Sequence, residues 1–229
     1  MMSMHDLTIC ILSAVEPPLP ECLKAVEAQE GGPYPVVRVH DVFPMSAAFA
    51  AMVERCESRF IVQVDCDIVL VPWAVLRLYE TLHRASWSYA AWGQLRERDW
   101  GLGGSVRLWR RWPLRVMGFR DVRTIDRDLH RRMSLIGLRR LRAHNADASG
   151  IFGEHRPRET CFSRYSKARG DVAKWRYLGR CDLINGVIAE ASDHFTKLGI
   201  RSGLSMPEQE VYRSKNLLSD WKAFHVATT

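Results

Sequence analysis

The stretch FIVQVDCDIVL, residues Phe60–Leu70, decides how this chain folds. It opens with a mostly apolar run, Phe60–Val64, that has the length of one strand. Such a run is typical of a strand buried on both faces of a parallel sheet. Two acids, Asp65 and Asp67, follow it at once, so a charged segment is expected where a buried strand ends.

The chain before and after this stretch alternates between expected strands and expected helices. Two more apolar runs, Leu7–Leu12 and Val36–Val39, predict strands. Apolar residues near a period of 3.6 predict helices over Leu19–Ala28, Met45–Cys56 and Pro72–Leu82. This order predicts an α/β fold with a mostly parallel central sheet flanked by helices.

The later chain gives weaker signals. Strands are expected at Tyr89–Gly93 and Val106–Trp109, with Trp100–Gly104 (WGLGG) as a loop between them. A helix is expected over Asp126–Ile136, and Gly137 ends it. Beyond Pro157 we expect one or two helices around residues 182–198.

Acidic residues follow each of the three expected parallel strands. They lie in Ser13–Glu16, at Asp41 and in Asp65–Asp67. Because ligands of such sheets bind beyond the carboxyl ends of the strands, these positions predict a ligand site.

The spacing of Asp65 and Asp67 puts both side chains on the same side of an extended segment. Two such carboxylates suit a hard divalent cation, Mg²⁺ or Mn²⁺, shared with the phosphates of a substrate. The alternative is that the two acids only cap local structure.

Composition excludes several classes of protein. No apolar run approaches the length of a membrane span, and the N-terminus does not read as a secretory signal. The six cysteines form no CxxC pair and are expected to be reduced and mostly buried. We therefore expect a cytoplasmic protein with at most peripheral membrane contact.

The net charge of +7 is concentrated in one segment. Residues 96–142 hold fourteen arginines, no lysine and five acids, which gives +9 and leaves −2 for the rest. This segment could meet phosphate, an anionic membrane surface or nucleic acid, or could simply be a solvated, internally paired surface. It carries no signature of a nucleic-acid-binding module, so no nucleic-acid partner is expected.

Two blocks of sequence resemble family-2-type glycosyltransferases of the GT-A fold. The first is Met45–Leu82, with a small-residue helix, an apolar strand, a D-x-D motif and a helix led by proline. The second joins Met117–Asp121, similar to the family's GF-x-[DE], to TIDRDLHRRMSLIG at Thr124–Gly137. The resemblance spans about residues 7–155 and implies a GT-A-like nucleotide-diphospho-sugar transferase fold.

The resemblance implies a donor site at the acids already noted. Glu16 and Asp41 match positions that contact the nucleoside, and Asp65 matches the first acid of the motif, near the ribose or the metal. Asp67 matches the acid that ligates the metal. His155, or alternatively His144, could match the histidine that some members add as a further ligand.

Two further groups complete the expected site. The resemblance makes Asp126 the catalytic base, although the family's preceding Glu is Ile125 here, which leaves Asp128 as an alternative. Asp126 could instead only cap its helix. Arg156 could bind a diphosphate through both arms of its guanidinium group.

The expected function is therefore metal-dependent, inverting transfer of a sugar from a UDP- or GDP-sugar to an acceptor hydroxyl. The Q-x-x-R-W element of processive synthases is absent, which favours a single addition to a glycan or lipid-linked acceptor, as in polysaccharide synthesis. A nucleotidyltransferase would need a Gly-rich, basic loop where this chain has SAVEPPLP. The remaining alternative is a degenerate GT-A domain that serves as a basic binding module.

The simplest division of the chain is a catalytic core followed by an extension. Residues 1–155 are expected to form the nucleotide-sugar-binding core, and residues 156–229 a mainly helical extension packed on the same domain.

Overall fold

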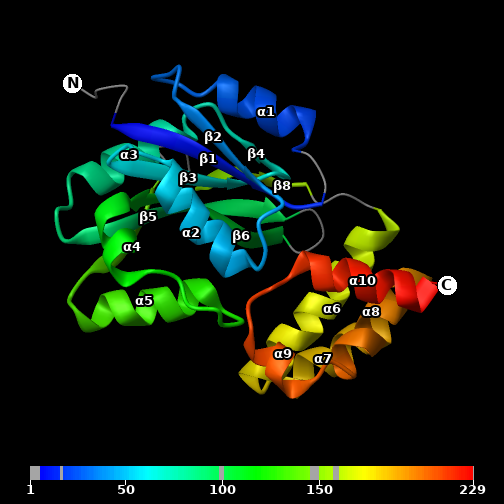
Figure 1. The fold of residues 1–229 in the computed structure, drawn as a ribbon. Coiled ribbons are helices and arrows are strands. Elements are labelled where there is room, and N and C mark those ends of the chain that lie inside the picture. The colour runs from blue at the N-terminus through cyan, green and yellow to red at the C-terminus, as the bar shows by residue number, and fades with distance from the viewer. Residues whose placement is uncertain (1–5, 16–17, 98–100, 145–149, 157–159, 229) are drawn as a thin grey trace. The chain divides into compact units, whose positions relative to one another are not determined.

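The structure, a computed structural model, describes residues 6–15, 18–97, 101–144, 150–156 and 160–228 (Figure 1). The chain forms two compact units. The first unit comprises Met1–Val42, Ala48–Phe119 and Arg127–Pro157, and the second comprises Phe43–Ala47, Arg120–Asp126 and Arg158–Thr229.

The first unit contains a mixed sheet. Its strands in the described residues are β1 (Leu7–Ser13), β2 (Val36–His40), β3 (Phe60–Asp65), β4 (Ile68–Leu70), β5 (Ser88–Glu97), β6 (Gly101–Arg110), β7 (Arg139–Arg142) and β8 (Ile151–His155). They lie in the order β2-β1-β3-β6-β5-β8-β4, and β7 also pairs with β5. Parallel pairs are β1–β2, β1–β3, β5–β7 and β5–β8; antiparallel pairs are β3–β6, β5–β6 and β4–β8. The expected α/β fold with a mostly parallel sheet is confirmed.

Helices cover both faces of this sheet. They are α1 (Pro20–Glu27), α2 (Met45–Arg55), α3 (Ala74–His83), α4 (Arg111–Met117) and α5 (Ile125–Leu135). On one face, α1 and α3 pack against a core that includes Ile9 and Val62. On the other, α2, α4 and α5 pack against a core that includes Cys10 and Ile61. Successive strand residues thus face opposite cores, which explains why these strands are apolar throughout.

Several sequence-based expectations about this unit are wrong. Gly101–Gly104, expected as part of a loop, belongs to β6, while Trp100 lies outside the described residues. Strands β4, β7 and β8 were not expected. Gly153 permits the pairing of β8 with β4, because a Cβ there would lie 2.6 Å from the carbonyl oxygen of Val69.

The described part of the second unit is built mainly from helices. They are α6 (Cys161–Leu178), α7 (Cys181–Glu190), α8 (His194–Leu204), α9 (Glu208–Tyr212) and α10 (Leu217–Thr228). The expectation of one or two helices around residues 182–198 is confirmed by α7 and α8, whereas α6, α9 and α10 were not expected. Helices α6 and α8 approach closely because Gly199 and Gly203 have no side chain: a Cβ on Gly199 would lie 2.3 Å from the Tyr165 carbonyl oxygen.

Among the described residues, no helix is both long and apolar enough to cross a membrane. Cys10, Cys22 and Cys56 are buried free thiols, in line with the expected role of the cysteines as small core residues. The division of the chain at residues 155 and 156 stays a prediction.

Candidate active site

The candidate site is the edge of the sheet where the parallel strands end. Strands β1, β2 and β3 run in one direction. Strand β6 is antiparallel to both β3 and β5, so β5, and β8 parallel to it, run in that direction as well. The last residues of these strands therefore share one edge: Ser13, His40, Asp65, Glu97 and His155.

Asp65 ends β3 and is exposed at this edge. Its Oδ1 accepts a hydrogen bond of 3.4 Å from the side-chain amide of Gln63, which is itself 8% exposed. The buried Trp109 indole donates to the Gln63 carbonyl oxygen at 3.2 Å, which orients the amide so that its NH₂ group faces Asp65. Sequence reasoning missed this role of Gln63, whose signal was a polar residue inside a buried strand.

Asp67 and His155 form the centre of the site. Asp67 lies in the turn between β3 and β4, and the antiparallel pairing of β4 with β8 sets Ile68 opposite His155. The Nε2 atom of His155 lies 3.0 Å from Oδ2 of Asp67, and both side chains are 26% exposed. Two residues far apart in sequence are thus brought together by strand pairing. His155 is the last residue of strand β8.

This pair offers one carboxylate oxygen and one imidazole nitrogen. Nitrogen and oxygen donors together suit Mn²⁺ better than Mg²⁺, which prefers oxygen alone. Within the described ranges, no group of three or more His, Cys, Asp and Glu side chains is arranged around a metal position. The residues present therefore fit a cation that completes its coordination with phosphate oxygens and water.

Cys22 lies beneath the D-x-D turn. Its Sγ is 3.8 Å from the Asp65 carbonyl oxygen. Burial, together with the nearby charges of Asp67 and Asp65, raises the pKa of this thiol to about 11. Because only a thiolate ligates metals well, Cys22 stays protonated and packs as a core residue.

His144, the other candidate ligand, lies elsewhere along β5. His155 pairs with Glu97, the last residue of β5, whereas the amide of Ala143 bonds to the carbonyl of Trp92, five residues earlier. His144 is exposed. The pairing with Asp67 makes His155 the stronger candidate of the two histidines.

Asp41 makes a hydrogen bond to the segment between β1 and α1. Its Oδ1 accepts the amide of Val15 at 2.7 Å, and its Oδ2 lies 3.1 Å from Nε2 of His40. Both Val15 and Asp41 adopt positive φ, 67° and 54°, a conformation that needs such local support. The other ring nitrogen of His40 lies 2.9 Å from Oγ of Ser13.

Glu16, the other residue expected to contact the nucleoside, lies outside the described residues.

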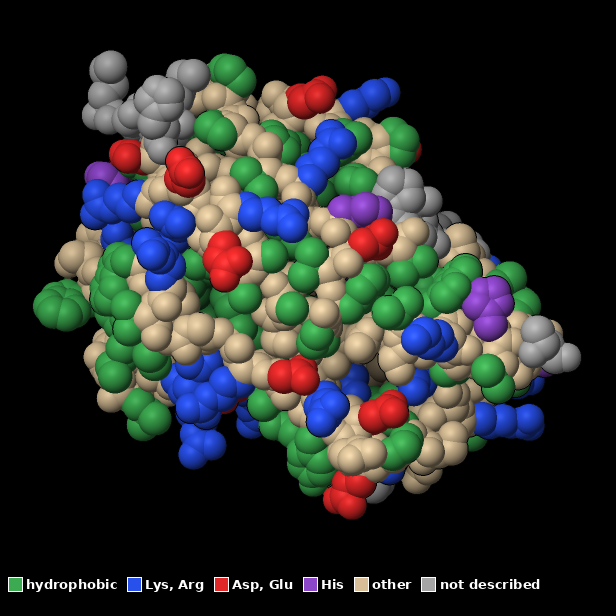
Figure 2. Space-filling view, in the orientation of Figure 1, with side chains coloured by type: hydrophobic (Ala, Val, Ile, Leu, Met, Phe, Trp, Pro, Cys, Tyr) green, Lys and Arg blue, Asp and Glu red, His purple; other side chains and the backbone are tan. Residues whose placement is uncertain are grey.

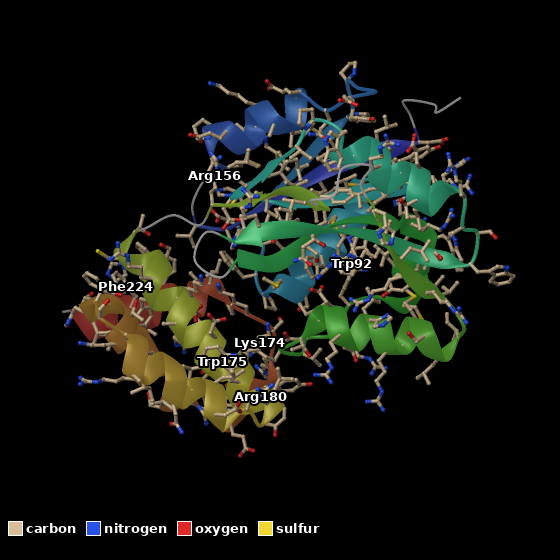
Figure 3. All side chains as sticks on the ribbon, turned by 180° about the vertical axis from the view of Figure 1, so that it is seen from behind. Trp92, Arg156, Lys174, Trp175, Arg180 and Phe224 are labelled. Atoms are coloured by element: carbon tan, nitrogen blue, oxygen red, sulfur yellow. The ribbon has the colours of Figure 1, made fainter. Side chains whose placement is uncertain are left out.

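Arg156 directly follows β8 (Figure 3). Its amide donates to the Asp67 carbonyl oxygen at 2.7 Å, and its guanidinium group binds Oε2 of Glu154 at 2.6 and 2.9 Å. Arg96, on the paired strand β5, lies 3.9 Å from the other oxygen of Glu154. Two half-exposed arginines therefore meet at this edge, and sequence reasoning missed Arg96 because it could not place the end of β5.

Asp126 and Asp128 lie in the first turn of α5, but in different units of the chain. Asp128 binds Nε of Arg132 at 2.8 Å, and that side chain is 11% exposed. Arg132 in turn donates to the carbonyl oxygens of Met117 and Gly118 at 2.6 and 2.9 Å. Asp128 thus has a structural partner that accounts for its presence.

Comparisons with known proteins give a likeness of fold. No model of a protein family matches the chain, and no curated protein matches it. A solved mannosyltransferase from Pyrobaculum calidifontis, in complex with GDP-mannose and Mn²⁺, is similar over 97% of this chain and 75% of its own, with a TM-score of 0.55 and 13% identity. A synthase of 4-diphosphocytidyl-2C-methyl-D-erythritol from Anaerococcus prevotii is less similar, with a TM-score of 0.43, 8% identity, and coverage of 66% of this chain and 93% of its own. The chain has a GT-A-like fold, as expected.

Proposed function

We propose that this protein is a glycosyltransferase that moves a sugar from a nucleotide-diphosphate donor to an acceptor hydroxyl. The observation that carries the proposal is the contact of Asp67 with His155 at the carboxyl edge of the sheet. An acid after a buried strand and a histidine from a paired strand form a donor set for a divalent cation, at the edge where such folds bind their ligands. The Mn²⁺ and GDP-mannose of the similar mannosyltransferase agree with this chemistry.

In this proposal, the chain's own residues each have a role in holding the donor. Asp67 and His155 hold Mn²⁺ or Mg²⁺, and a cation there would neutralise charge on the departing diphosphate. Asp65 contacts the donor near its ribose, and Asp41 and Glu16 contact the nucleoside. Arg156 exchanges its contact with Glu154 for a contact with the diphosphate, because the two arms of its guanidinium group can donate to phosphate oxygens together.

Asp126 is the proposed base, which takes the proton of the acceptor hydroxyl and leads to inversion at the sugar carbon. It lies in the first turn of α5, at the N-terminus of that helix. The acceptor is proposed to be a glycan or lipid-linked glycan that receives one sugar, in the cytoplasm or at the membrane that bounds it. Polysaccharide synthesis is the process that fits such a reaction.

The experiment that tests the proposal is calorimetric titration with UDP and with GDP, each with and without Mn²⁺. Binding should require Mn²⁺ and should disappear in Asp67→Ala and weaken at least about tenfold in His155→Ala. His144→Ala is the matched control and should bind as the wild type does. Failure of both nucleotides to bind under any condition would contradict the proposal and favour a degenerate domain that acts through its basic surface.

A further inference from the structure

Five large hydrophobic side chains of the first unit are exposed near the opposite edge of the sheet, where the parallel strands begin. Each keeps between 55% and 78% of its surface exposed. They are Trp87, Trp112, Val116, Leu135 and Ile136, and we call them the apolar edge.

Strand pairing brings three of these positions, Trp87, Leu135 and Ile136, to the same side of the unit. Trp87 immediately precedes β5, and its carbonyl oxygen accepts the amide of Arg139 at 3.2 Å, at the start of β7. Leu135 and Ile136 lie within four residues of Arg139, at the end of α5. The connection from α3 to β5 and the end of α5 therefore lie on the same side of the unit.

Helix α4 joins this side through Arg110, the last residue of β6. The buried Arg110 side chain donates to the Ser88 carbonyl oxygen at 2.8 Å, directly after Trp87. Trp112 and Val116 follow on α4, one helical turn apart, so they share a face of that helix. Figure 1 shows the α3–β5 connection and α4 at the left of this unit, and hydrophobic and basic side chains lie together along the lower left margin in Figure 2.

Exposed arginines accompany the apolar edge. Arg84 precedes Trp87 by three residues, Arg115 adjoins Val116, and Arg131 precedes Leu135 by one turn of α5. Arg59 and Arg139 are also exposed at the starts of β3 and β7. Two acids, Asp6 and Glu57, lie at this edge as well, which leaves an excess of three positive charges among these residues.

We propose that the apolar edge inserts into the interfacial region of an anionic lipid bilayer. Exposed tryptophans with aliphatic neighbours bind at the level of lipid headgroups, where one end of the indole is apolar and the other polar. The surrounding arginines complement an anionic surface, and each basic residue near such a surface adds about 1 kcal/mol of attraction. A protein partner with an apolar surface would not require this excess of positive charge.

The position of this edge constrains the acceptor, a step that rests on the proposed function. Strand β3 begins beside Arg59 and ends at Asp65, so six residues of strand, about 20 Å, separate the bilayer from the donor site. The donor site then faces water. The acceptor hydroxyl belongs to a glycan end that extends from the membrane, not to the lipid headgroup itself.

The test is co-sedimentation of the full chain with vesicles of phosphatidylcholine alone or mixed equally with phosphatidylglycerol. We expect binding to the mixed vesicles that weakens in 0.5 M salt. Trp87→Ser/Leu135→Ser and Arg84→Ser/Arg131→Ser should each lower the partition coefficient at least about tenfold. The matched controls are Leu183→Ser/Leu204→Ser and Lys24→Ser/Arg38→Ser, which remove exposed apolar side chains of the second unit or exposed basic side chains of α1 and β2 and should bind as the wild type does.

Three outcomes would overturn the proposal. The first is no binding to anionic vesicles, and the second is an equal loss of vesicle binding in the control variants. The third is a dimer in sedimentation velocity, dissociated by Trp87→Ser/Leu135→Ser, in a protein that binds no vesicles. Vesicle binding by Asp67→Ala should equal that of the wild type, so failure of the donor-site proposal leaves this test intact. If saturating vesicles weaken nucleotide binding, the inference that the donor site faces water is wrong.

Discussion

Asp126 and Asp128 are two residues apart on one helical turn, yet their surroundings predict opposite effects of the same substitution. Asp128 holds Arg132, whose other donors satisfy two backbone carbonyls. Asp128→Asn removes the charge that compensates this largely buried guanidinium group, so the free energy of unfolding should fall by about 1–3 kcal/mol. Catalysis by the folded fraction should persist.

Asp126→Asn should act the other way under the proposed function. Loss of a general base lowers kcat by about 10²–10⁴ while the protein stays folded. Urea unfolding measured by circular dichroism, together with sugar transfer from the donor that binds, separates the two variants. If Asp128→Asn loses activity and keeps its stability, the roles assigned to the two acids are reversed.

Sequence reasoning found the acids of the candidate site more readily than their partners. Asp65 and Asp67 follow a strand whose apolar run is unmistakable, so their place at the ligand edge could be predicted. The contact of His155 with Asp67 depends on the pairing of β4 with β8, two short strands that are far apart in sequence. Local patterns carry no information on such pairing, and only the family resemblance pointed to His155.

At the scale of elements, the strands that were missed share a physical cause. Strand β7 reads RRLR because three of its four side chains are exposed, and two of its arginines cover the exposed side of Trp92. The glycines of β6 suggested a loop. In both cases, the neighbouring strand supplies the hydrogen bonds that define the strand, whereas the side chains give no apolar pattern.

Helix α6 was missed for a related reason. Its buried positions include Ser166 and Arg169, so an apolar period of 3.6 is interrupted where the helix faces the interior. Arg169 is tolerated there because Asp220 of α10 pairs with it. Because Arg169 and Asp220 are far apart in sequence, a pattern of neighbouring residues cannot reveal that Asp220 compensates the charge of Arg169.

Helix α5 contains a histidine that should make stability depend on pH. Nδ1 of His130 lies 3.1 Å from the Tyr89 hydroxyl, and the two rings stack. Burial, and after it the charge of Arg140, lowers the pKa of His130 below its usual value near 6.5. Below that pH the unfolded chain binds more protons than the folded one, so this contribution to stability is lost as pH falls.

The measurement is urea unfolding of the wild type and of His130→Gln between pH 7.5 and 5. The wild type should lose more of its free energy of unfolding over this range than the variant, since glutamine cannot take up a proton. His83→Gln, an exposed histidine of α3, serves as the control and should follow the wild type. If the free energy of unfolding falls with pH by the same amount in the wild type and in His130→Gln, His130 has the same pKa in the folded and the unfolded chain.

At the scale of the whole molecule, the basic segment divides between internal support and surface. Arg110 donates to three backbone carbonyls, of Leu82, Ala85 and Ser88, and burial lowers its pKa. Arg132 and Arg123 likewise bind backbone carbonyls. The net positive charge of residues 96–142 therefore overstates the positive charge that a partner could contact. Part of the exposed positive charge lies at the apolar edge.

The second unit has a charged interior of its own. Arg169 and Asp220 form a buried ion pair, with side chains 8% and 6% exposed. Ser166 donates to the other oxygen of Asp220 at 2.9 Å, and Arg169 donates to Ser202 of α8 at 3.0 Å. Arg169 and Asp220 border a polar cavity of about 260 Å³, which Arg123, Glu210 and Arg213 also line. The Arg169–Asp220 pair and its hydrogen bonds thus connect α6, α8 and α10.

Removing one partner of this pair should therefore loosen the second unit selectively. Asp220→Asn removes the nearest counter-charge of the buried Arg169 and leaves it only Glu210, whose Oε2 lies 3.4 Å from Nη2, which costs about 3–5 kcal/mol. Hydrogen exchange measured by mass spectrometry should show faster exchange in α6, α8 and α10, while β1 and β3 keep their protection, because local stability follows local contacts. Asp182→Asn, which breaks an exposed pair with Arg180, should leave exchange unchanged outside its own turn. Equal loss of protection in β1 and β3 would mean that the chain unfolds as one cooperative body despite its two units.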